Sequence, residues 1–169
     1  EIERGIEDGL ADAGYEGSNV ELTVLNAEAD QSKIQTMSKK LVDDGNDVVI
    51  GIATPAAQGL SSATSDIPVI MGAISDPVGA KLVKNLDKPE GNVTGLSNHV
   101  PHAQTVELIQ TITPDAKTIG VLYASSEDNS VSQVKEFTQY AEEAGLTVVE
   151  YAVPSTNEIT TTMSVMTGK

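Results

Sequence analysis

Apolar and polar residues follow two different periods along the chain. Short continuous apolar runs, typical of strands buried in a parallel sheet, occur at 47–52, 68–72 and 118–123, and a further short strand is predicted at 92–96. Apolar residues at helical spacing predict helices over 1–13, 30–44, 56–65, 101–113, 129–144 and 156–166. The stretches 20–25 and 146–153 predict two further strands. This alternation of strands with helices is the pattern of an α/β protein with parallel sheets.

One strand–loop–helix pattern occurs twice. The strand at 47–52 runs into the loop Ala53-Thr54-Pro55, and the strand at 118–123 runs into the loop 124–130. Two such patterns predict two lobes, 1–96 and 97–169, that hold one ligand between them. The repeat also predicts strands before Glu1 and after Lys169, so we expect a fragment that lacks the first strand and the end of the second lobe. The alternative is a complete small domain of flavodoxin-like type.

The composition argues against several classes of function. The 169 residues carry a formal net charge of −15, which disfavours nucleic acid and anionic membrane surfaces as partners. Without cysteine there is no disulfide, thiolate metal site or cysteine nucleophile. Apolar residues make up 39% of the chain, enough for a core, and no apolar run is long enough to span a membrane.

The loops after the predicted strands carry the candidate binding residues, because open α/β sheets bind ligands at the carboxyl edge. Ala53, Thr54 and Pro55 combine small side chains, a hydroxyl and the free N–H groups of a helix start, which attract a carboxylate. After the next strand, Ser75 can donate to a carboxylate and Asp76 can bind an ammonium group. Each stretch also has a purely local interpretation, as a βα turn with a threonine cap and as an aspartate–proline turn.

The second copy of the pattern offers a matching loop. Its hydroxyl and carboxylate groups would hold a zwitterion from the other side, and these residues are Ser125, Ser126, Glu127, Asn129 and Ser130. A cluster of this kind is also an ordinary helix cap. Ser97 and Asn98 come where the chain would cross between lobes, and they complete the candidate set.

His99 and His102 have a spacing at which two histidines can share a metal ion. Pro101 interrupts a helix between them, and no third ligand stands out nearby in the sequence. We therefore expect no metal and no other cofactor.

Enzymatic function has little support from motifs. The sequence contains neither the glycine-rich nucleotide motifs nor the serine-hydrolase elbow. The remaining alternative is a flavodoxin-like enzyme or sensor that uses Asp76, Glu127 and Asp128 as catalytic or metal-binding carboxylates at the strand carboxyl edge. A sugar or nucleoside binder of the same fold is a further alternative.

Several segments, taken in order, resemble one family of solute-binding proteins. They are Asn46–Gln58, Pro68–Met71, Ser75-Asp76-Pro77, Gly91–Gly95, 119–130 and 153–159. Together they resemble the ABC transporter substrate-binding family that includes the streptococcal tryptophan-binding lipoproteins. The resemblance covers nearly the whole chain.

The resemblance implies a type I periplasmic-binding fold, in which two parallel-sheet lobes with flanking helices close on a ligand by hinge motion. It implies capture of a small zwitterion, an aromatic or apolar amino acid such as tryptophan, and its transfer to the membrane permease of an ABC importer, without catalysis. It also implies an extracellular, membrane-anchored lipoprotein or a periplasmic protein of a bacterium. By analogy, the loops at Thr54, Ser75–Asp76, Ser97–Asn98 and Ser125–Ser130 would face the cleft.

Overall fold

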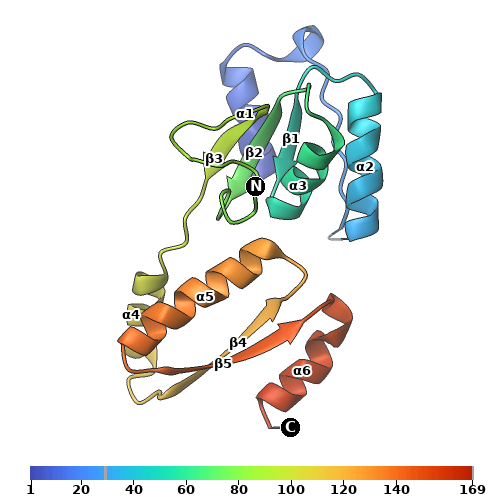
Figure 1. Cartoon of the computed structure of the whole chain (residues 1–169). Coiled ribbons are helices and arrows are strands. Elements are labelled where there is room, and N and C mark those ends of the chain that lie inside the picture. Colours follow the sequence, from blue (N-terminus) through green and yellow to red (C-terminus); the bar gives the residue numbers. More distant parts are fainter. Residues whose placement is uncertain (29, 169) are drawn as a thin grey trace. The chain divides into compact units, whose positions relative to one another are not determined.

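The computed structural model describes residues 1–28 and 30–168, and it divides into two compact units, Glu1–Asn98 and His99–Lys169. Unit 1 contains a three-stranded sheet in the order β1-β2-β3, and unit 2 contains the pair β4-β5 (Figure 1). All of these strand pairs are parallel, as the apolar runs predict.

The strands of unit 1 are β1 (Val49–Ile52), β2 (Val69–Ile74) and β3 (Val93–Ser97). They pair with Val49 opposite Val69 and Val69 opposite Val93, so their carboxyl ends lie at one edge. The helical segments are α1 (Ile2–Asp12), the short 3-10 helix η1 (Gly17–Asn19), α2 (Gln31–Asp43) and α3 (Thr54–Ala63).

Helices cover both faces of this sheet. On one face Gly51 of β1 lies directly against the backbone of Ala57 in α3. Gly72 is one position beyond the partner of Gly51, so a β-carbon there would point to the opposite face, where Ile6 of α1 approaches. The core between α3 and the sheet is built from buried aliphatic residues, among them Val49, Leu60, Val69, Met71, Ile74 and Val93.

Two polar side chains fix the connections of unit 1. Asp30 caps α2, because its carboxylate accepts from the amides of Ser32 (2.9 Å) and Lys33 (3.3 Å). Hydrogen bonding from the Ser32 side chain and these amides lowers the pKa of Asp30. Asn92 donates its amide to the carbonyl groups at 64 (3.2 Å) and 67 (2.8 Å), so it ties the start of β3 to the end of α3.

Unit 2 has a smaller sheet of two strands. Its strands are β4 (Thr118–Ala124) and β5 (Thr147–Val153), paired throughout their length. Its helices are α4 (His102–Ile112), α5 (Asp128–Glu143) and α6 (Ile159–Met166), the last preceded by the 3-10 helix η2 (Thr156–Glu158). The main core cluster consists of Val106, Phe137, Ala141 and Leu146.

The predicted strand at Val20–Leu25 is wrong. This segment has no sheet partner within the described residues, and Leu22 and Val24 are 48% and 56% exposed. Val20 itself does have the extended backbone angles of a strand residue. A strand also needs a hydrogen-bonding neighbour, which a local pattern cannot supply.

The boundary between the units lies after Asn98, slightly beyond the sequence-based boundary at 96. The reason is that pairing with β2 continues to the end of β3. Ser97 lies opposite Ile74, and the Asn98 N–H donates to the Ile74 carbonyl at 2.9 Å. Both candidate crossover residues are therefore part of the sheet edge of unit 1.

Candidate functional site

The carboxyl edge of unit 1 gathers the first three groups of candidate residues. Ala53, Ser75 and Asn98 are each the first residue after one of the three parallel strands. Backbone hydrogen bonds join these positions, because the Ala53 N–H donates to the Gly72 carbonyl (3.0 Å) and the Asn98 N–H donates to Ile74. We call this set of residues, Ala53–Pro55, Ser75–Asp76 and Ser97–Asn98, the unit 1 edge.

The unit 1 edge begins with an abrupt turn. Ala53 alone connects β1 to α3, and it has a φ of 69° and a ψ of 159°, a region populated almost only by glycine. Thr54 is the first residue of the helix rather than its cap, and it is only 2% exposed. Pro55 occupies the first turn, and no side chain caps the helix. The N–H groups of Thr54 and Ala56 therefore have no acceptor inside the helix.

Asp76 organises the loop after β2. One of its carboxylate oxygens accepts from the Gly79 N–H at 2.8 Å, and its carbonyl accepts from the Ala80 N–H at 3.0 Å. The turn holds Asp76 and its neighbour Ser75 half-buried next to the end of the strand. The local interpretation of Asp76 as a turn residue is confirmed, and it is compatible with a charge presented at the edge of the sheet.

The matching loop of unit 2 follows β4. Ser125 and Ser126 are exposed, and the Ser125 N–H donates to the Val153 carbonyl at 2.9 Å. Glu127 is the N-cap residue of α5 and accepts a long hydrogen bond from Ser130 (3.4 Å). Asn129 has a buried side-chain oxygen without a hydrogen-bond partner among the described residues. The loop therefore offers hydroxyls, a carboxylate and one unused acceptor.

The two histidines lie near a carboxylate that the sequence did not reveal. Glu136 of α5 is 3.5 Å from Nε2 of His99 and 3.9 Å from Nε2 of His102. His102 is buried and packs edge-on against Phe137. Since Glu136 is far from both histidines in the sequence, no local motif could have found it. Within residues 1–28 and 30–168, no group of three acidic, histidine or cysteine side chains is arranged to hold a metal ion.

Burial lowers the pKa of His102 below its usual 6.5; the charge of Glu136 acts in the opposite direction, and His99 adds to the lowering. The unfolded chain therefore binds more protons than the folded chain between the lowered pKa and 6.5. We expect the free energy of unfolding to decrease as the pH falls through that window, by at most about 1.4 kcal/mol per pH unit.

Urea denaturation between about pH 5 and about pH 8 measures this effect. His102→Gln should remove the slope that belongs to this residue. His99→Gln is the comparison: it should keep most of the slope, because burial lowers the pKa of His102 more than the 68% exposed His99 does. An unchanged pH profile in His102→Gln would show that the buried ring is not the titrating group.

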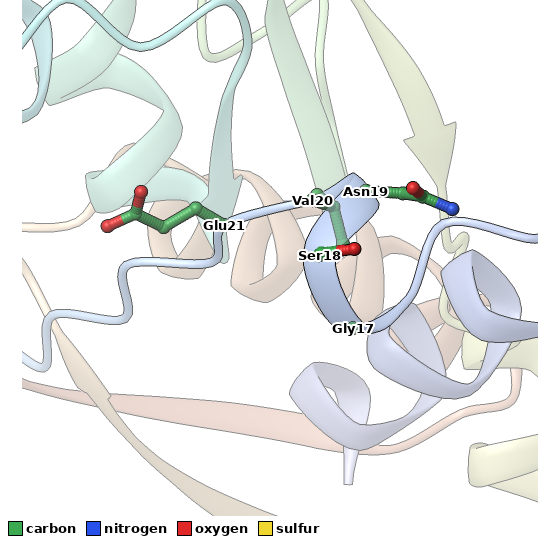
Figure 2. Close-up of a pocket in the computed structure, with 5 residues that line it drawn as sticks. All are labelled: Gly17, Ser18, Asn19, Val20 and Glu21. Carbon is green, nitrogen blue, oxygen red and sulfur yellow. The ribbon is translucent and has the colours of Figure 1, made fainter.

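Two hollows on the surface lie largely outside these polar loops; of the unit 1 edge, Ser97 lines one of them. One is lined by Gly17, Ser18, Asn19, Val20 and Glu21, and Figure 2 shows the side chains of Asn19 and Glu21 pointing in opposite directions. A stretch with diverging side chains does not enclose a small ligand. A second hollow has mostly apolar walls between β3 and the turn after β2, lined by Met71, Pro77, Val83, Leu86, Pro89, Thr94, Gly95 and Ser97. Neither includes Thr54 or Asp76.

Parallel sheets flanked by helices, with polar loops at the carboxyl edge, define an α/β protein of the kind that binds small ligands at that edge. Comparison with known families identifies the particular class. All of residues 1–169 match the family of ABC transporter substrate binding proteins, and the chain belongs to that family. Within the part that the structure describes, no helix has the length and apolar character needed to cross a membrane.

Three similar proteins define the relationship more closely. A tyrosine-binding protein from Clostridioides difficile is 42% identical over 98% of this chain and 48% of its own length. A crystal structure of an ABC domain from Streptococcus pneumoniae in complex with L-Trp is 64% identical, with a TM-score of 0.97 over 99% of this chain and 57% of that one. A leucine-binding protein from Thermotoga maritima is 17% identical, with a TM-score of 0.71 over 99% of this chain and 48% of that one.

These similarities establish the fold as the type I periplasmic-binding fold expected from the sequence. The chain spans about half the length of the tyrosine-binding protein and 57% of the chain that was solved with L-Trp.

Proposed function

We propose that the protein is the solute-binding component of an ABC importer and that it captures an aromatic amino acid outside the cytoplasmic membrane. Family membership supports the binding role. The relatives named for tyrosine and solved with L-Trp support the aromatic ligand, since both exceed 40% identity over nearly all of this chain. The proposed partner is a membrane permease, and the proposed location is extracellular or periplasmic, with a lipid anchor as the finer proposal.

The observation that carries the proposal is the arrangement of the unit 1 edge. The start of α3 presents N–H groups that have no acceptor inside the helix, and the buried Thr54 provides a hydroxyl there. A helix N-terminus of this kind stabilises an anion, and the carboxylate of an amino acid is such an anion. We therefore propose that the α-carboxylate binds at Thr54.

The ammonium group of the same amino acid requires an acceptor close to its carboxylate, because both groups are attached to one carbon. Asp76 leaves the strand next to β1 at the same edge, and its turn fixes the side chain through the Gly79 N–H. We propose that Asp76 binds the ammonium group. Ser75, Ser97 and Asn98 then supply hydrogen bonds around the head group, and the loop Ser125–Ser130 supplies the second set of polar contacts.

Isothermal titration calorimetry of the full-length gene product against the twenty amino acids tests this proposal. We expect L-tryptophan or L-tyrosine to bind with a Kd of about 1 µM or lower, equivalent to about −8 kcal/mol. N-acetyl-L-tryptophan lacks the ammonium charge and L-tryptophanamide lacks the carboxylate, so each should bind at least about tenfold more weakly. Absence of heat with every amino acid would refute the proposal.

A further inference from the structure

Two strained alanines lie side by side at the unit 1 edge. Ala53 has a φ of 69° and Ala73 has a φ of 58°, values that alanine rarely adopts. Ile52 is opposite Gly72 in the sheet, so the next residue along each strand is one of the two alanines. The Ala53 N–H donates to the Gly72 carbonyl at 3.0 Å, which joins the two strained segments directly.

The local fold explains why the backbone turns at these positions. Ala53 must reverse the chain from β1 into α3 by itself, and Ala73 lies where the register of β2 shifts between Met71 and Ile74. The local fold does not explain why the residues are alanines. Glycine meets the same backbone requirement without a clash of the β-carbon.

In unit 2 a strand connects to the following helix without such backbone strain. Between β4 and α5 the residues 125–127 make the same strand-to-helix transition. Among the described residues of unit 2, no residue other than glycine has a positive φ. In unit 1, Glu28 (φ 53°) and Lys81 (φ 58°) also have a positive φ, but both lie outside the unit 1 edge. Ala53 and Ala73 differ from them because they lie next to each other where we place the head group of the ligand.

We propose that Ala53 and Ala73 are positioning residues for the ligand, an inference that rests on the proposed function of the unit 1 edge. A β-carbon at each position removes most of the backbone conformations that glycine would sample. The N–H groups of Thr54 and Ala56 are thereby held in the binding geometry before the ligand arrives. Binding then loses less entropy on ordering the loop, at the expense of stability in the free protein.

The Ala53→Gly variant of the full-length gene product tests this inference, because stability and affinity should change in opposite directions. The melting temperature of the free protein should rise by about 2 °C as the β-carbon strain is relieved. The Kd for L-tryptophan should increase by about tenfold. Hydrogen exchange at the Thr54 and Ala56 amides should become faster. Ala73→Gly should show the same signs.

Ala63→Gly is the matched control, because Ala63 is the last residue of the same helix and has no positive φ. It should lower the melting temperature and leave the Kd unchanged. The inference is overturned if Ala53→Gly binds L-tryptophan as tightly as the wild type, or if its two amides exchange no faster. If the wild type binds no amino acid, the proposed function fails separately, and the exchange rates still decide whether the alanines order the loop.

Discussion

Replacing Gly51 with alanine is expected to lower the free energy of unfolding by about 3 kcal/mol or more. A β-carbon at this position would lie 2.5 Å from the Cα and 2.6 Å from the N of Ala57. Both atoms belong to the backbone of α3, so no side-chain rotation can relieve the overlap. The helix would have to move away from β1, which would open the core around Val49 and Leu60.

Urea denaturation of the full-length protein measures this loss, and Gly120→Ala is the matched control. A β-carbon on Gly120 of β4 would lie 2.4 Å from Cε of Met166, the flexible end of a side chain that can turn aside. The control should therefore change stability by less than about 1 kcal/mol. Equal midpoints for Gly51→Ala and the wild type would contradict the close packing of β1 on α3.

Replacing Asp76 with asparagine is expected to weaken binding of L-tryptophan by about 10- to 100-fold, because a hydrogen bond to a charged group contributes about 1.5–3 kcal/mol. Asparagine has the same shape and retains an oxygen that can accept from the Gly79 N–H, the contact that forms the turn. The melting temperature should therefore change little. The change in Kd measured by calorimetry then reflects the loss of the negative charge, because the loop keeps its structure.

Two comparisons make this experiment specific. Indole-3-propionate resembles tryptophan without its ammonium group, so Asp76→Asn should not weaken its binding further. Glu127→Gln makes the same change from carboxylate to amide in the loop of unit 2, and it should reduce affinity for tryptophan much less. A large loss in Glu127→Gln with none in Asp76→Asn would transfer the ammonium site to Glu127.

The strand pattern could be predicted because its cause is local. Buried parallel strands need continuous apolar residues, and the runs at 47–52 and 118–123 coincide with β1 and β4 to within two residues at each end. The error at Val20–Leu25 has the opposite cause. Val20 has the extended backbone angles of a strand residue, but pairing depends on another strand, and the described residues contain none beside this segment.

The composition of the unit 1 edge could be predicted for a topological reason. Parallel strands place every loop that follows them at one edge, so Thr54 and Ser75 were expected together. Ser97 was expected at the crossover between lobes, and the structure places it at the same edge because its strand pairs with β2. The finer features arise from contacts and angles that residue types do not encode. Three such features are the Asp76 contact with Gly79, the positive φ of Ala53 and the approach of Glu136 to the histidines.

The central claim is that the head group of an aromatic amino acid binds at the unit 1 edge. A crystal structure of the full-length gene product with L-tryptophan tests it most directly. We predict that the α-carboxylate lies within hydrogen-bonding distance of the N–H or hydroxyl of Thr54 and that the ammonium group lies beside Asp76. An amino acid bound with its carboxylate away from the start of α3 would contradict the account.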